Sequence, residues 1–255
     1  MGLATTLDHE IASVRSWYHQ IELAPGVITP GVNHSAAALD ALSLPSDLSG
    51  CRVLDLGTRD GFFAFECERR GAEVAAVDAA PLADTGFAVA RRHLRSHVHY
   101  QQRNIWDLSR DADGTFDIVL CLGLLYHLRD PLAALDLIRS LCRGTLYLET
   151  AILNPAASHV FNGIGAWGTD VAEFERTPVM QFLPGRVAND DPTNFWLPNA
   201  ACLRAMLEET NFVVERLDVH GPRAVAVARP SFDASLERVN DVASALRPRR
   251  TALAG

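Results

Sequence analysis

Short apolar runs alternate with helical stretches from residue 51 to residue 151, and this alternation limits the possible folds more than any other feature of the chain. The runs are rich in Val, Leu and Ala, which is typical of strands buried on both faces. Helices between such strands bring them side by side into one parallel sheet. The sequence therefore predicts an α/β fold with a doubly wound, mostly parallel sheet. Strands are expected at 51–57, 72–78, 97–102, 115–123 and 145–153, with helices at 60–72, 81–96 and 130–144.

The ends of these helices carry recognisable residue signals. Gly71 follows the first helix and is expected to stop it. Pro81 would stand in the first turn of the second helix, where its missing N–H costs nothing. Asp130 would cap the third helix, with Pro131 as its first residue.

The alternation stops near residue 152. The stretch 152–197 is rich in Gly, Pro, Asn and aromatic residues, and so long an irregular segment within a domain is usually functional. A helix is expected at 198–212. Two further runs, 213–221 and 223–230, flank a Gly-Pro turn and predict an antiparallel hairpin that completes a seven-stranded sheet.

Three parts follow from this organisation. Residues 1–48 would form an N-terminal helix, near 5–20, and a lid-like segment around VITPGVNH. Residues 49–230 would form the main domain, with 152–197 as an insertion on its substrate side. Residues 231–255 would form a C-terminal helix and tail.

Composition excludes several classes of function. The chain contains no lysine, which both a pyridoxal-phosphate Schiff base and a Walker-type phosphate loop require. The five cysteines are scattered without a CxxC pair, so neither a disulfide framework nor a metal site is expected. A net charge of −8 makes a nucleic-acid partner unlikely. No apolar run is long enough to span a membrane and no export signal is visible, which predicts a cytoplasmic protein.

The most informative local motif is VLDLGTRDG, residues 53–61. A strand, a glycine turn and a helix start place backbone N–H groups beside a ligand, with Gly57, Thr58 and Gly61 in the turn. Such a turn is shared with dinucleotide-binding proteins. Asp55 favours another ligand, because a carboxylate repels pyrophosphate but suits the cationic amino-acid end of S-adenosylmethionine. A plain structural turn is the remaining alternative.

Two further loops would complete a nucleoside site. Asp78 ends the second strand and can accept hydrogen bonds from both ribose hydroxyls, with Ala79 beside it. Asn104, Ile105 and Trp106 follow the third strand, where Ile105 and Trp106 could sandwich an adenine ring. The alternatives are a solvated acid at the strand end and an ordinary core cluster.

The motifs DLGTRDG, AVD and FDIVLCLGLLYHLRDP together resemble the class I methyltransferases. The block LGLLYHLRDP is similar to the branch that includes the tRNA wobble-uridine carboxymethyltransferase, as are WYHQIELAPGVITPG, YLETAI and NFWLPNAACLRAML. The resemblance covers roughly residues 15–230. It implies a Rossmann-like methyltransferase fold, S-adenosylmethionine as cofactor, and cofactor contacts at Asp55, Gly57, Gly61, Asp78, Ile105, Trp106, Leu122 and Tyr126.

His127 is the candidate general base, because it follows the fourth strand where this fold opens toward the substrate and its pKa range suits proton transfer. A structural role for His127 is the alternative. His19 and His34 are rival bases if the N-terminal segment covers the site. Tyr18, His19 and Trp196 are candidate substrate contacts, and the aromatic residues of the insertion could line an apolar pocket.

We therefore expect O- or N-methylation of a small molecule, with natural products among the candidate acceptors, by a protein that could form oligomers. A tRNA uridine-modifying methyl- or carboxymethyltransferase is the alternative, and an inactive scaffold or a nicotinamide enzyme are weaker rivals. A carboxylated donor would need a cation near the site. The chain has no lysine and no arginine between Arg15 and Arg52, so ordinary S-adenosylmethionine is the expected donor.

Overall fold

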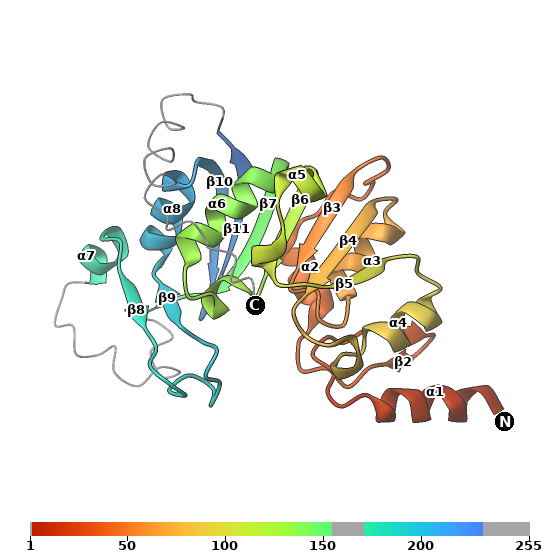
Figure 1. The fold of residues 1–255 in the computed structure, drawn as a ribbon. Helices are drawn as coiled ribbons and strands as arrows, with labels where there is room; N and C mark the ends of the chain where they lie inside the picture. The colour runs from red at the N-terminus through yellow and green to blue at the C-terminus, as the bar shows by residue number, and fades with distance from the viewer. Residues whose placement is uncertain (1, 155–170, 232–255) are drawn as a thin grey trace, which may run out of the picture.

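In a computed structural model, which describes residues 2–154 and 171–231, seven strands form one twisted sheet (Figure 1). The strand order is β10-β11-β7-β6-β3-β4-β5, and only β11 runs against its neighbours, so the expected mostly parallel sheet with a terminal antiparallel hairpin is confirmed. The strands are β3 (Arg52–Leu56), β4 (Glu73–Asp78), β5 (His99–Gln102), β6 (Phe116–Leu122), β7 (Cys142–Ala151), β10 (Phe212–His220) and β11 (Arg223–Pro230).

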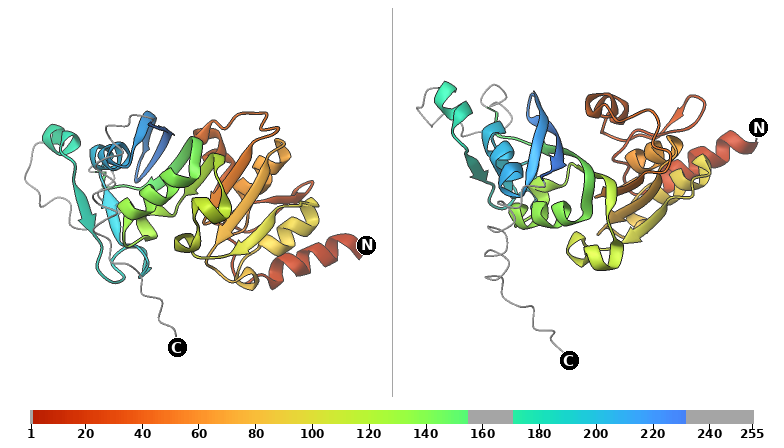
Figure 2. Two further views of the ribbon diagram at one scale, coloured as in Figure 1. Left: turned by 45° about the horizontal axis from the view of Figure 1, so that its top comes forward. Right: turned by 90° about the horizontal axis from the view of Figure 1, so that it is seen from above.

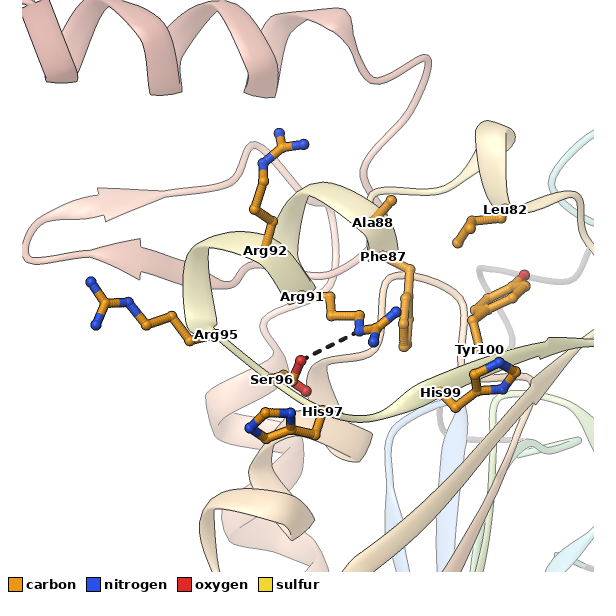
Figure 3. Close-up of a pocket in the computed structure, with 10 residues that line it drawn as sticks. All are labelled: Leu82, Phe87, Ala88, Arg91, Arg92, Arg95, Ser96, His97, His99 and Tyr100. Atoms are coloured by element: carbon orange, nitrogen blue, oxygen red, sulfur yellow. Dashed lines mark hydrogen bonds between the residues drawn. The ribbon is translucent and has the colours of Figure 1, made fainter.

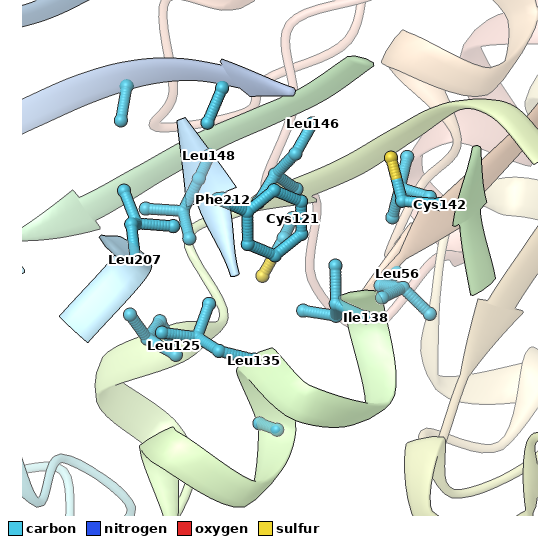
Figure 4. Close-up of a cluster of buried hydrophobic side chains, with 14 of the residues drawn as sticks. Leu56, Cys121, Leu125, Leu135, Ile138, Cys142, Leu146, Leu148, Leu207 and Phe212 are labelled. Carbon is cyan, nitrogen blue, oxygen red and sulfur yellow. The ribbon is translucent and has the colours of Figure 1, made fainter. Parts of the chain in front are cut away.

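Helices cover both faces of the sheet (Figures 1 and 2). Alternate residues of a strand point to opposite faces, and in β3 Val53 packs with α2 and α3 whereas Leu54 packs with α6 and α8. On the face covered by α6 and α8, leucines from these two helices and from β7 surround the ring of Phe212 (Figure 4). The helices are α1 (Gly2–Ser13), α2 (Ser35–Leu42), α3 (Phe62–Arg69), α4 (Phe87–Leu94), α5 (Arg110–Asp113), α6 (Pro131–Leu141), α7 (Val171–Arg176) and α8 (Ala200–Glu209).

The helix expected at 81–96 is wrong in its first half. Pro81 precedes only a short 3-10 turn, Thr85 is extended, and α4 begins at Phe87. The cause lies outside the helix: the Gly86 N–H donates to the carboxylate of Asp60, and a Cβ at Gly86 would lie 2.1 Å from the ring of Trp17. Tertiary packing therefore overrides a favourable proline signal.

Boundaries of two other helices also differ from expectation, while the cap of one of them is confirmed. Asp130 caps α6, since its Oδ1 accepts the N–H of Ala133, and Pro131 is the first helical residue. The helix ends at Leu141 rather than residue 144, because β7 already pairs with β6 from Cys142. The N-terminal helix covers 2–13, not 5–20.

Two small antiparallel ribbons, one in the N-terminal segment and one in the insertion, were not expected. The N-terminal segment forms a ribbon of β1 (Glu22–Ala24) and β2 (Val27–Ile28), and His19 bridges to Asn33. The insertion forms a second ribbon of β8 (Met180–Phe182) and β9 (Trp196–Pro198). The expected C-terminal helix, beyond residue 231, lies outside the described residues. Within 2–154 and 171–231, no helix combines the length and the apolar character that crossing a bilayer requires.

Candidate active site

The glycine turn after β3 forms the centre of the candidate site. Gly57 and Gly61 both have positive φ, +75° and +89°, and Arg59 between them takes φ +52°. The N–H groups of Gly57 and Thr58 donate to the carbonyl of Val77, which ties the turn to the end of β4. A Cβ at Gly61 would lie 2.6 Å from the ring of Phe65, so this position also needs glycine for space. Backbone hydrogen bonds and the space available thus both fix the conformation of this turn.

Asp55 lies buried beneath this turn. Burial raises the pKa of its carboxyl to about 7. Among the described residues, neither its Oδ2 nor the buried hydroxyl of Thr58 makes a well-formed hydrogen bond, although the Thr58 hydroxyl and the Ala64 N–H lie close enough to limit the rise in the Asp55 pKa. Burying a carboxylate oxygen without a well-formed hydrogen bond costs folding free energy, unless a bound donor or cation pairs with it. These two groups therefore fit the ammonium end of an amino-acid cofactor.

Asp78 stands at the carboxyl end of β4, half-buried beside the turn. Its Oδ2 accepts the N–H of Arg59 at 2.8 Å and its Oδ1 accepts the N–H of Ala80 at 2.8 Å. Each ionised oxygen keeps a further acceptor site. The carboxylate is thus oriented by the backbone and able to accept two hydroxyl groups of a ribose. Ala79, its neighbour, is exposed.

The third loop contains the 3-10 turn Ile105–Asp107. Asn104 caps it, because its side-chain oxygen accepts the N–H of Trp106. Ile105 is buried in the main core, whereas Trp106 is only partly buried at the edge of that core. Of the two residues expected to sandwich an adenine, Trp106 has the surface to do so and Ile105 contributes mainly to the core.

Asp60 connects the turn to the N-terminal segment, a role that the sequence analysis missed. Its buried carboxylate accepts the backbone N–H groups of Tyr18 at 2.6 Å and His19 at 2.9 Å, and also that of Gly86 at 2.8 Å. We call this arrangement the Asp60 latch. It holds residues 18 and 19 beside the glycine turn.

Two cavities open at this end of the sheet, and both are lined by Tyr18 and Arg223. The larger, of about 600 Å³, has an apolar wall and a polar wall. The smaller, of about 350 Å³, lies between the insertion and the turn after β6. The larger cavity is lined by Ala37, Ala38, Leu42, Phe63, Leu122 and Val225, and by His19, Asn33, His34, Glu149 and His220. The smaller is lined by Tyr126, His127, Ala151, Leu183, Asp191, Asn194 and Leu197.

Arg223 stands where the two cavities meet, and the sequence analysis missed it. Its guanidinium forms a two-point ion pair with Glu149, and it lies over the ring of Tyr126, 5.0 Å from the centroid. Burial opposes the charge of Arg223, but Glu149 outweighs burial and raises its pKa. The sequence analysis found no arginine between Arg15 and Arg52, and the cation that lies at the site comes instead from β11. Glu149 nevertheless already neutralises this one.

His127 ends the 3-10 turn Leu125–His127 after β6 and lines the smaller cavity. Burial lowers the pKa of its imidazole, so the ring is neutral at pH 7 and able to accept a proton. Its Nδ1 lies 2.9 Å from the hydroxyl and 3.1 Å from the carbonyl of Thr193. The candidate base thus faces a cavity, with one ring nitrogen held by the insertion.

The rival bases are placed less favourably. His19 is buried, and burial lowers its pKa to about 4, which makes it a weak proton acceptor. His34 is exposed at the rim of the larger cavity, and its Nδ1 contacts the side chain of Gln20 at 3.2 Å.

Trp196 lines neither of these two cavities, so its expected substrate contact is not supported. In β9 successive side chains point to opposite sides. Leu197 points into the smaller cavity, whereas Trp196 packs on Phe182 and donates its indole N–H to the carbonyl of Arg129. Of the expected substrate contacts, Tyr18 and His19 do line cavities.

A third hollow, of about 540 Å³, lies away from these residues on α4 and the edge strand β5 (Figure 3). Arginines 91, 92 and 95 and two histidines surround it, and Arg91 is bonded to the carbonyl of Ser96. Ligands of open α/β sheets bind at the carboxyl ends of the strands. His99 is the first residue of β5, so this hollow does not belong to the candidate site.

A model of a known family matches residues 33–217, and its description is a methyltransferase domain. The chain belongs to this methyltransferase family. The matched range includes the glycine turn, Asp78 and His127, so the class I assignment made from the sequence is confirmed. Membership in the tRNA wobble-uridine branch is not shown by this match.

Individual relatives of this methyltransferase agree with the family. A ubiquinone biosynthesis O-methyltransferase of Xanthomonas campestris is 36% identical over 158 residues, which are 60% of this chain and 63% of that protein. The matched region thus spans less than two thirds of that relative.

Solved structures show the same fold. The structure of a putative S-adenosylmethionine-dependent methyltransferase of Listeria monocytogenes superposes with a TM-score of 0.56 over 77% of this chain and 99% of its own, at 17% identity. The 1,6-didemethyltoxoflavin-N1-methyltransferase of Burkholderia thailandensis superposes at 0.53 over 89% of this chain and 88% of its own, at 16% identity. The Rossmann-like fold is therefore confirmed.

Proposed function

We propose that this methyltransferase transfers the methyl group of S-adenosylmethionine to a hydroxyl group, or alternatively a nitrogen, of a small organic acceptor. The observation behind this proposal is the position of His127, which lines a cavity of about 350 Å³ directly after the strand that ends beside the glycine turn. Cavities of this size, partly apolar with a few polar groups, suit small molecules. The O-methyltransferase relative and the N1-methyltransferase structure support the two acceptor atoms.

Different residues of the site would bind the cofactor and take up the proton in such a reaction. S-adenosylmethionine, when bound, supplies an electrophilic methyl group. Asp55 and Asp78 would hold its ammonium and ribose, and Trp106 would lie against its base. The protein would then align the acceptor in the cavities and shield it from water. The neutral imidazole of His127 would take the proton of the attacking hydroxyl.

The tRNA-modifying alternative rests on the block LGLLYHLRDP and has less support. The net charge of −8 disfavours binding to a phosphate backbone. The cation that a carboxylated donor would need is paired with Glu149, so a second carboxylate beside Arg223 would meet a like charge. We therefore propose ordinary S-adenosylmethionine as the donor.

Replacing Asp78 with alanine tests the cofactor site. The affinity for S-adenosylhomocysteine, measured by calorimetry, is expected to fall by about 1–3 kcal/mol, because two charge-assisted hydrogen bonds are lost. Asp84→Ala is the matched control, since Asp84 lies in the next loop with its side chain 46% exposed. Wild-type affinity in Asp78→Ala, or tighter binding of NAD or of a carboxylated donor than of the ordinary one, would contradict the proposal.

Cofactor affinity should also depend on pH through Asp55. Its pKa of about 7 means that the carboxyl is largely protonated below pH 6 in the free protein. A bound ammonium favours the ionised form, so binding should release a proton, and affinity should rise with pH until it levels off above about 7. Calorimetry in buffers of different ionisation enthalpy measures that proton. Asp55→Asn should abolish the release, and a pH-independent wild-type affinity would refute this role.

A further inference from the structure

The insertion supplies His127 with two partners that the proposed function does not yet include. Thr193 lies 66 residues away in sequence, in the loop before β9, and its hydroxyl and carbonyl both contact Nδ1 of His127. The same hydroxyl lies 2.6 Å from Oδ1 of Asp191, which also accepts the N–H of Thr193 at 2.8 Å. His127, Thr193 and Asp191 thus form one chain of hydrogen bonds.

The direction of these hydrogen bonds follows from the groups involved. A backbone carbonyl can only accept, so the contact with the carbonyl of Thr193 requires a proton on Nδ1 of His127. Asp191 is ionised: partial burial opposes its charge, but the bonds from Thr193 outweigh burial and keep its pKa below the usual value. The single hydroxyl proton of Thr193 therefore goes to Asp191. The hydroxyl oxygen then accepts from Nδ1 as well.

We infer that Thr193 and Asp191 are positioning residues that fix the proton of neutral His127 on Nδ1 and leave Nε2 as the proton acceptor. This inference rests on the proposed function, because it gives the orienting groups of its base. The arrangement is that of a base whose second nitrogen is held by an acceptor. The insertion then completes the catalytic group as well as lining the acceptor cavity.

Four titratable groups lie around His127, and their charges determine in which direction its pKa shifts in a variant. Asp191 carries a negative charge, Arg223 of β11 carries a positive one, and the phenols of Tyr126 and Tyr18 line the same cavity. The charge of Asp191 favours the imidazolium. Asp191→Asn should therefore lower the pKa of His127 and move the acid limb of the kcat profile to lower pH. Loss of structure alone would not produce this shift.

The tautomer can be observed directly in the full chain. Nitrogen-15 NMR of labelled histidines, with the His127 signals assigned by their loss in His127→Asn, is expected to show Nδ1 protonated and Nε2 unprotonated near pH 8. Asp191→Ala, which removes the acceptor of the Thr193 hydroxyl proton, and Thr193→Val should raise the fraction protonated on Nε2, and Thr193→Ser should keep the wild-type state. Wild-type protein protonated on Nε2 would overturn the inference.

Activity supplies the second readout. Asp191→Asn and Thr193→Val should lower kcat at least about tenfold with little change in KM for the donor. Asp190→Asn is the matched control, because Asp190 is exposed, contacts Arg186 and takes a left-handed φ of +54° that asparagine tolerates. Equal kcat in Asp191→Asn and Asp190→Asn would overturn the inference. A wild-type tautomer on Nδ1 with undiminished turnover in His127→Ala would instead refute only the proposed base.

Discussion

Replacing His127 with alanine is expected to lower the turnover by roughly 10²–10⁴ while leaving the affinity for S-adenosylhomocysteine unchanged. The reason is that a neutral imidazole lining the smaller cavity is lost from the proton-transfer step, whereas Asp55 and Asp78, which would hold the cofactor, stay in place. The measurement is kcat with a saturating hydroxylated acceptor, together with calorimetry of the cofactor product.

A second histidine variant serves as the control for the loss of turnover in His127→Ala. His97 is exposed in the loop between α4 and β5, where it lines the third hollow, and His97→Ala should have wild-type turnover. If His127→Ala also kept wild-type turnover, the role of base would pass to His19 or His34, or to no side chain. Burial already makes His19 a poor acceptor at neutral pH.

The second large effect concerns stability rather than turnover. Asp60→Ala should lower the free energy of unfolding by about 3–5 kcal/mol, because three backbone N–H groups, of Tyr18, His19 and Gly86, lose their only acceptor in the latch. Each such donor left unpaired in a buried position costs about 1–3 kcal/mol. Urea unfolding, followed by fluorescence, measures the loss.

Asp84→Ala serves as the control for this loss as well. Asp84 lies just before α4, and its contact with Arg15 is a long surface ion pair of 3.9 Å. Its removal should change the free energy of unfolding by no more than about 0.5 kcal/mol. If Asp60→Ala were equally mild, the N-terminal segment would not depend on the latch, and its place beside the turn would need another cause.

Local patterns in the sequence were sufficient for most of the fold. The strand ending in Asp55 and Gly57, and the helix capped by Asp130, follow from residues close together in the chain. The start of α4 was mispredicted because its cause, the ring of Trp17 packed on Gly86, lies 69 residues from it. Propensity has no information about such contacts.

The candidate site likewise contains residues that local motifs locate and residues that only the fold brings together. The cofactor residues follow a strand and could be located by motif, whereas the pairs Arg223–Glu149 and His127–Thr193 join residues 74 and 66 apart. Nothing in the composition of the insertion marks Thr193 as a partner of His127. Trp196 was chosen as a substrate contact because it is aromatic. In the short strand β9 successive side chains alternate, and it is the neighbouring Leu197 that lines the cavity.

The Asp60 latch also has a thermodynamic consequence. One carboxylate belongs to the turn proposed to hold the donor and, through two N–H groups, positions Tyr18 and His19 in the walls of the cavities proposed for the acceptor. Any stiffening of the turn by the donor therefore reaches those walls. Linkage then requires reciprocity: the factor by which the donor alters the acceptor's dissociation constant equals the factor by which the acceptor alters the donor's. We therefore expect donor and acceptor to bind cooperatively.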